Sequence, residues 1–372
     1  MASKRSLALR ADVGQLLIMG FDGTAVSDRL RLMWQTLQPG GIILFQRNLE
    51  SAQQAHALLR DAQGISQIPM FLCVDMEGGS VDRLRDIVAP APSVADVAAS
   101  GSKTLFRRHG RLIGEEVRAL GFNTDFAPVV DLRQPQSKDV LGSRTVSAQP
   151  KPTITYAREF LRGLGDANVL GCGKHFPGLG EATLDTHAEL PSIAKHWKPL
   201  WKQDLLPYRK LHRKLPFIMV AHAAYPEVTG DTSPASLSKK WMTGVLRKKI
   251  DYQGLIITDD LDMGGVLAAA SIEDAAVETL RAGADIFLVC QKEESVRRAV
   301  EAVLKEAERD PKFARLVARK AKGVRKMKEK SKALRKSTSP APSQKSIERL
   351  SRKLWEFAEE LRAHAVSSED AG

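Results

Sequence analysis

Residues 254–290 read GLIITDDLDMGGVLAAASIEDAAVETLRAGADIFLVC. The apolar run Gly254–Asp259 ends in acidic residues, and residues 272–282 then repeat apolar positions at helical spacing. A second apolar run, Asp285–Cys290, closes the segment. This order predicts a strand, a helix and a second strand parallel to the first.

The same alternation continues through most of the chain. Strands are predicted at Gln15–Phe21, Gly41–Phe45, Met70–Asp75, Asn123–Asp131, Val169–His175, Phe217–Ala223, Gly254–Asp259 and Asp285–Cys290. Helices are predicted near residues 27–37, 51–64, 103–120, 153–167, 199–214, 238–250, 272–282 and 293–308. Strands that are each followed by a helix predict an α/β fold, a (β/α)8 TIM barrel. A doubly wound sheet is the alternative, but no Gly-rich phosphate turn follows any predicted strand.

The positive charge is concentrated in the C-terminal part of the sequence. The formal net charge is +12, and residues 312–336 hold twelve Lys or Arg against one acid, Glu329. We expect a catalytic barrel over 1–330, a basic Pro/Ser linker over 331–346, and an amphipathic helix and tail over 347–372. The basic segment lacks interleaved aromatic residues, so we expect a solvated helix face and no nucleic-acid partner.

Composition and patterning narrow the protein class. Cys73, Cys172 and Cys290 lie in apolar runs without metal-ligand spacing, which indicates buried thiols in a cytoplasmic protein. The N-terminus lacks the apolar region of a signal peptide, and no apolar run approaches the ~18 residues of a membrane span. The sequence sets no oligomeric state.

Charged residues gather where the predicted strands end. They are Asp75, Arg83, Asp131, Arg144, Lys174, His175, His222, Asp259 and Asp260. In a TIM barrel the C-terminal strand ends build the active site, and unpaired charges there are costly unless they are used. We therefore predict that a polar substrate binds at this end of the barrel.

The loop after the fifth predicted strand carries the densest group of polar residues. Lys174 and His175 end the strand, and Asp185-Thr186-His187 follows within a Gly- and Pro-rich loop. An Asp placed two residues before a His can hold one imidazole nitrogen and raise the basicity of the other. Such a loop could carry the Asp185–His187 pair over a substrate.

Several chemistries can be weighed against these residues. The spacing of the histidines is a weak metal-ligand pattern, and a Gly-x-Ser-x-Gly elbow is absent. Schiff-base formation by Lys174 stays open. Acetal cleavage needs a nucleophilic carboxylate and a proton donor, which Asp259 and the Asp185–His187 pair could supply.

Six motifs in order resemble those of glycoside hydrolase family 3 β-N-acetylglucosaminidases, in the single-domain form that recycles cell wall. The resemblance runs from about residue 12 to residue 330. The motifs are Ile43-Leu44-Phe45-Gln46-Arg47-Asn48, Val74-Asp75-Met76-Glu77-Gly78-Gly79, Phe126-Ala127-Pro128-Val129-Val130-Asp131, Lys174-His175-Phe176-Pro177-Gly178, Asp185-Thr186-His187 and Thr258-Asp259-Asp260-Leu261-Asp262-Met263.

The resemblance implies a role for each matching residue. Asp259 matches the nucleophile that forms a glycosyl-enzyme, and His187 matches the general acid/base that Asp185 orients. The matches to sugar-holding residues are Asp75, Arg83, Arg144, Lys174 and His175. The implied enzyme is a retaining exo-β-N-acetylhexosaminidase that removes β-1,4-linked N-acetylglucosamine from muropeptides, without metal or other cofactor.

Two positions depart from the family pattern. Leu179 stands where the family usually has His, and Ser80 stands where it usually has Arg. Neither matches a catalytic position. The alternatives are a phosphorylase on the same fold, since a neutral His repels phosphate less than a carboxylate does, and a non-catalytic sugar-binding barrel.

Overall fold

The computed structural model describes residues 4–186, 188–335 and 340–369, and within them parallel strands close into an eight-stranded barrel. The order around the barrel is β1-β10-β9-β8-β7-β6-β3-β2, so the first and last strands are neighbours. The strands are β1 (Leu17–Met19), β2 (Gly41–Ile43), β3 (Phe71–Val74), β6 (Thr124–Asp125), β7 (Leu170–Phe176), β8 (Phe217–Val220), β9 (Leu255–Asp260) and β10 (Ile286–Val289). The predicted (β/α)8 barrel is confirmed.

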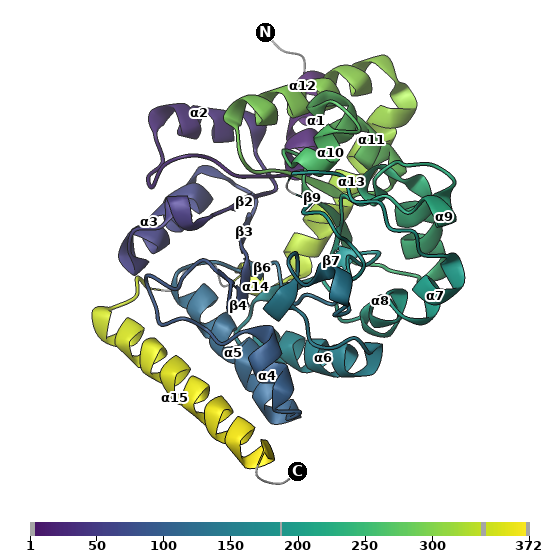
Figure 1. The fold of residues 1–372 in the computed structure, drawn as a ribbon. Helices are drawn as coiled ribbons and strands as arrows, with labels where there is room; N and C mark the ends of the chain where they lie inside the picture. Colours follow the sequence, from purple (N-terminus) through teal and green to yellow (C-terminus); the bar gives the residue numbers. More distant parts are fainter. Residues whose placement is uncertain (1–3, 187, 336–339, 370–372) are drawn as a thin grey trace.

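Helices surround the barrel (Figure 1). They are α1 (Lys4–Gln15), α2 (Asp28–Leu37), α3 (Ala52–Ile65), α4 (Val94–Ala99), α5 (Lys103–Ala119), α6 (Pro150–Asp166), α7 (Trp197–Lys202), α8 (Leu205–Leu211), α9 (Pro226–Thr229), the π-helix η5 (Lys240–Lys249), α10 (Gly264–Leu267), α11 (Ile272–Ala282), α12 (Glu293–Arg309), α13 (Pro311–Lys330), α14 (Lys332–Arg335) and α15 (Gln344–Glu369). Serine side chains cap several of them: the Oγ of Ser51 and of Ser271 each accept a hydrogen bond from the third backbone N–H of the helix. These caps satisfy amides that the helix cannot pair itself.

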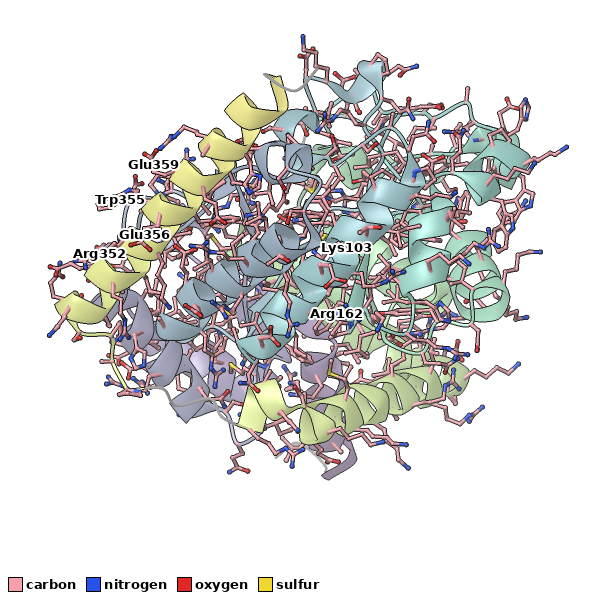
Figure 2. All side chains as sticks on the ribbon, turned by 90° about the horizontal axis from the view of Figure 1, so that it is seen from below. Lys103, Arg162, Arg352, Trp355, Glu356 and Glu359 are labelled. Atoms are coloured by element: carbon pink, nitrogen blue, oxygen red, sulfur yellow. The ribbon has the colours of Figure 1, made fainter. Side chains whose placement is uncertain are left out.

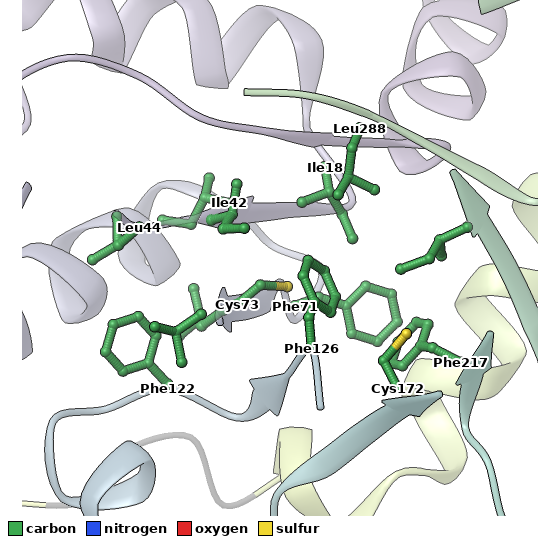
Figure 3. Packing of buried hydrophobic residues seen from close by; sticks show 14 of the residues in the cluster. Ile18, Ile42, Leu44, Phe71, Cys73, Phe122, Phe126, Cys172, Phe217 and Leu288 are labelled. Atoms are coloured by element: carbon green, nitrogen blue, oxygen red, sulfur yellow. The ribbon is translucent and has the colours of Figure 1, made fainter. Parts of the chain in front are cut away.

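Apolar side chains fill the barrel interior (Figure 3). Phe71 on β3 and Phe217 on β8 meet edge to face, with ring centroids 5.0 Å apart. Because β3 and β8 are not neighbours in the barrel, this contact crosses its interior. The interior is therefore a packed core, and polar groups concentrate at the ends of the strands.

Two predicted elements differ from the structure. The strand predicted at Asn123–Asp131 is regular only over β6, because Pro128 has no N–H to donate to the ladder. The backbone nevertheless continues beside β7, since Val130 N–H donates to the Lys174 carbonyl. The helix predicted at 199–214 is split into α7 and α8, and Pro207 cannot bond to the carbonyl four residues back.

A short antiparallel hairpin follows β3 and was not predicted. Its strands are β4 (Met76–Gly78) and β5 (Val81–Asp82). Gly78 and Gly79 both have positive φ, at 86° and 62°, which side-chain-bearing residues rarely adopt. The hairpin projects from the same end of the barrel as the strand ends that carry the charged residues.

Helix α13 lies across the opposite end of the barrel. Its buried Lys328 donates from Nζ to the Gln15 side chain and to the Gly40 carbonyl, at 2.8 and 2.7 Å. These groups directly precede β1 and β2, so Lys328 holds the N-terminal ends of those strands together. The other face of α13 is exposed and basic, with residues Lys312, Arg315, Arg319, Lys322, Lys326 and Lys330.

Helix α15 lies on the outer wall of the barrel, against α4 and α5 (Figures 1 and 2). It begins at Gln344, and the short helix α14 lies within the segment expected to be a linker. No helix in the described residues is long and apolar enough to cross a bilayer.

Candidate active site

A cavity of about 200 Å³ opens at the C-terminal ends of the strands. Polar side chains from most of the strand ends line it: Asp75, Glu77, Arg83, Arg144, Lys174, His175, Asp185, Asp259, Asp260 and Gln291. Apolar residues such as Phe45, Phe126 and Met219 complete the wall. All the residues to which the resemblance gives a role line this cavity except His187, which lies outside the described residues. Asp131 and His222, also predicted at strand ends, are not in the lining.

A larger hollow of about 820 Å³ lies at the opposite end, beside α13 and the starts of β7 and β9. Its lining includes one carboxylate, Asp285, which is paired with Arg247 and accepts a hydrogen bond from Ile256 N–H. That carboxylate is therefore committed to the barrel framework. The smaller cavity is the one in which several polar groups converge, as a catalytic site requires.

Four charged side chains form a network on one side of the cavity. The fully buried Glu77 carboxylate accepts from Arg144 Nε and Nη2 at 2.8 and 2.9 Å. Lys174 Nζ lies 2.6 Å from Glu77 Oε1 and 2.8 Å from Asp75 Oδ1. The two carboxylates and two cations balance each other, so the network can be buried without a net charge.

The network also sets the protonation of its members. Burial alone would raise the pKa of Glu77, but Arg144 and Lys174 hold that pKa well below its usual range. Burial alone would lower the pKa of Lys174, but Asp75 and Glu77 raise it above its usual value. Lys174 is therefore an ammonium group suited to donating hydrogen bonds. The Schiff-base chemistry left open by the sequence would need a neutral amine at this position.

His175 is held in one orientation by Asp131. The buried Asp131 carboxylate accepts from His175 Nδ1 at 2.7 Å, from His175 N–H at 3.1 Å and from Leu179 N–H at 2.8 Å. The carboxylate keeps the proton on Nδ1, which leaves Nε2 as the ring nitrogen available to a ligand. Leu179, a departure from the family pattern, thus contributes to this site by donating its backbone N–H to Asp131.

Asp259 and Asp260, at the end of β9, have different environments. Asp259 is partly exposed at the cavity, and its Oδ1 accepts from Asp260 N–H at 2.9 Å. Burial alone would raise the pKa of Asp259, but the imidazoles of His175 and His222 and this hydrogen bond lower it below its usual range. An ionised carboxylate on the cavity surface can act as a nucleophile.

The neighbouring Asp260 connects β9 to the end of β10. Its Oδ1 accepts from Cys290 N–H at 2.9 Å, and Gln291 Nε2 donates to its Oδ2 at 3.3 Å. Burial raises the pKa of Asp260 to about 6. The buried His222 lies beneath, with Nε2 donating to the Asp260 carbonyl at 2.9 Å. Asp260 and His222 thus support the backbone that presents Asp259.

The loop that carries Asp185 rests on α10. Gly265 N–H donates to the Thr186 carbonyl at 3.1 Å, and a Cβ on Gly265 would lie 2.8 Å from the same oxygen. Glycine is therefore needed for this close approach. The Asp185 side chain is exposed and belongs to the rim of the cavity.

The sequence interpretation missed some of the residues that build the site. The sequence motifs assign no role to Glu77 or to Gln291, and both line the cavity. The signal for Glu77 was its place two residues after Asp75, next to the paired glycines. Ser80, the second departure, is exposed at the tip of the hairpin and is not in the cavity lining.

Arg83 follows β5 and reaches the cavity from the hairpin. Its Nε is buried and has no hydrogen-bond partner in the described part of the chain. A buried donor without a partner is costly, which makes it a natural contact for a polar ligand. Over the same described ranges, no group of three or more His, Cys, Asp or Glu side chains is arranged to hold a metal ion.

Comparison with known proteins gives consistent matches. The sequence pattern of the Glycosyl hydrolase family 3 N terminal domain matches residues 8–321. A β-hexosaminidase of Idiomarina loihiensis is 34% identical over 278 residues, which cover 74% of this chain and 83% of the relative.

The chain is also similar to solved structures of other proteins. A glycoside hydrolase family 3 β-N-acetylglucosaminidase from Paenibacillus sp. str. FPU-7 is 30% identical with a TM-score of 0.86, covering 94% of this chain and 68% of that one. NagZ from Neisseria gonorrhoeae, solved in complex with N-trifluoroacetyl-D-glucosamine, is 26% identical with a TM-score of 0.70, covering 83% and 98%.

Proposed function

The chain belongs to glycoside hydrolase family 3, and from that premise we propose that it removes terminal N-acetylglucosamine from peptidoglycan-derived muropeptides through a covalent glycosyl-enzyme. It is a β-N-acetylhexosaminidase. The muropeptide substrate, the covalent step, the residue roles and a cytoplasmic location belong to the proposal.

The observation that carries the mechanism is the ionised Asp259 carboxylate at the cavity surface. In the first step Asp259 attacks the anomeric carbon and forms a glycosyl ester, while His187 gives a proton to the departing oxygen. In the second step His187 takes a proton from water, and that water displaces Asp259 with net retention. Asp185 stabilises the cationic form of His187, which is present before the first step and again after the second.

The remaining polar groups suit the sugar. Lys174 and Arg144 present cationic donors, Asp75 presents an acceptor, and Arg83 presents a buried Nε donor that has no partner among the described residues. A cavity of about 200 Å³ is below the ~300 Å³ lower end of ordinary ligand pockets, which favours one sugar ring at a chain end. The Neisseria protein's complex with an N-acylated glucosamine supports the same class of ligand.

The first experiment measures release of 4-nitrophenol from its β-N-acetylglucosaminide. We expect Asp259→Asn to lose nearly all turnover, while Asp61→Asn, an exposed acid on α3, keeps it. The enzyme can also be mixed with a fluorinated substrate that it hydrolyses slowly and then quenched with acid. Mass spectrometry should find the sugar on the peptide containing Asp259. Wild-type turnover in Asp259→Asn would exclude this residue as the nucleophile.

A second experiment tests the acid/base pair. His187→Ala and Asp185→Ala should lose more activity on a disaccharide or muropeptide than on the nitrophenyl substrate, whose leaving group needs little protonation. Equal losses on both substrates would contradict the role of His187. Repeating the assay with inorganic phosphate separates hydrolysis from phosphorolysis, since only the latter yields a sugar phosphate.

A further inference from the structure

Helix α15 lies beyond the part of the chain that matches the family domain. One face of the helix is buried against the barrel wall, and it is formed by Ile347, Leu350, Leu354, Phe357 and Leu361. The opposite face carries Arg352, Trp355, Glu356 and Glu359 (Figure 2), and Trp355 is 61% exposed. The helix is thus anchored from Ile347 to Leu361 on the outer wall of the barrel.

Ion pairs fix the position of α15 along α5. Lys353 Nζ lies 2.6 Å from Glu115 Oε2, and Arg108 pairs with Glu360. Arg108 also lies over the Phe357 ring, 5.2 Å from its centroid. These contacts hold Phe357 and Ser351 in a defined register on the barrel.

The first connection to the site runs through Ser351. Its Oγ accepts a hydrogen bond from Ala89 N–H at 3.2 Å. Two residues on, Ala91 N–H donates to Asp82 Oδ2 at 2.9 Å, and the Ala91 carbonyl accepts from Gly79 N–H at 2.9 Å. The segment held by Ser351 is therefore bonded to strand β5 and to the turn of the β4–β5 hairpin.

The second connection runs through Phe357. Its ring stacks on the buried His109 of α5, with centroids 6.0 Å apart and planes at 28°. His109 Nδ1 lies 2.8 Å from the Tyr156 hydroxyl, which fixes the imidazole from its other side. A Cβ on Gly78 would lie 3.1 Å from His109 Nε2, so the imidazole packs directly on the hairpin backbone.

Both connections end on the β4–β5 hairpin, which carries Glu77 and directly precedes Arg83. We propose that α15 braces the β4–β5 hairpin, with Phe357 and Ser351 as positioning residues for substrate binding. The inference rests on the proposed function, because that function assigns the sugar contacts to Arg83 and to the partners of Glu77. Loss of the Phe357 and Ser351 contacts displaces Arg83 and the partners of Glu77, and it leaves Asp259, on β9, in place.

The experiment compares two residues on opposite faces of α15. Phe357→Ala should raise KM for the nitrophenyl substrate and the inhibition constant of N-acetylglucosamine by roughly tenfold, the loss expected when about one hydrogen bond to a charged group is weakened. The kcat per correctly folded enzyme should change less than about twofold. Trp355→Ala should match wild type, and Phe357→Leu should restore much of the affinity.

Ser351→Ala is the milder variant and should raise both constants in the same direction if Phe357→Ala fails to fold. A fall in maximal rate at unchanged KM and inhibition constant would overturn the proposal, since it indicates only loss of folded enzyme. Hydrogen exchange over residues 76–92 gives an independent readout. Faster exchange there in the Phe357 or Ser351 variant supports the brace even if the assigned sugar contacts are wrong, and unchanged exchange overturns it.

Discussion

Replacing Glu77 by Gln keeps the shape of a buried side chain and removes its charge. The carboxylate accepts three charge-assisted contacts, two from Arg144 and one from Lys174, and its side chain is fully buried. The amide could accept through one oxygen only, and its NH2 group would face a cation. Breaking a buried ionic network by removing one member costs about 3–5 kcal/mol, so we expect Glu77→Gln to lose about that much unfolding free energy.

The loss should depend on pH with a definite sign. The folded-state pKa of Glu77 is well below the ~4.3 of an unfolded Glu. Its contribution to stability is therefore complete above the unfolded pKa and is lost as the pH falls toward the folded one. We expect the difference between wild type and Glu77→Gln to be constant from about pH 6 to pH 8 and to shrink below about pH 4.

Urea unfolding followed by tryptophan fluorescence measures this difference, and nitrophenyl hydrolysis should show weaker substrate binding in the variant. Glu301→Gln is the matched control, because its pair with Arg297 is exposed on a helix surface and should contribute little to stability. A Glu77→Gln loss as small as that of the control would refute the argument. So would a loss that stays the same at acid pH.

Three further expectations follow from buried polar groups. Asp131→Asn should lower kcat/KM at least about tenfold in the nitrophenyl assay, since the amide no longer holds the proton on His175 Nδ1; unchanged kinetics would contradict that role. Burial lowers the pKa of Lys328 to about 7, so the unfolded chain binds more protons above that pH. Wild type should therefore gain stability relative to Lys328→Met between pH 7 and pH 9 in urea titrations, and a flat difference would count against it. The three buried cysteines should react with a thiol reagent only after unfolding, and rapid labelling of the native protein would show that they are accessible.

The sequence predicted the barrel because its strands and helices alternate with clear periodicity. It also predicted that the polar residues lie close together, since the C-terminal ends of parallel strands must meet at one end of a barrel. It could not predict which charges pair, because Glu77 meets Lys174 and Arg144 only through the hairpin after β3. That hairpin depends on positive φ at Gly78 and Gly79, which apolar periodicity does not reveal.

The C-terminal helix shows the same limit of local patterns. The spacing of Leu350, Leu354 and Phe357 predicted an apolar face. The surface it would cover was set by tertiary contacts with α5, far earlier in the chain (Arg108 and Glu360 are 252 residues apart). Asp131 likewise had no assignable role until the backbone N–H of Leu179 and the ring of His175 converged on it.

The pairing of β1 with β10 has a consequence for synthesis on the ribosome. These strands join the first and last parts of the barrel, and Lys328 of α13 then connects to residues just before β1 and β2. At about 5–20 residues per second, the nascent strand β1 waits on the order of tens of seconds for its partner. Until β10 emerges, the edge of β1 that it pairs with is open, and an unpaired strand edge can pair with another chain.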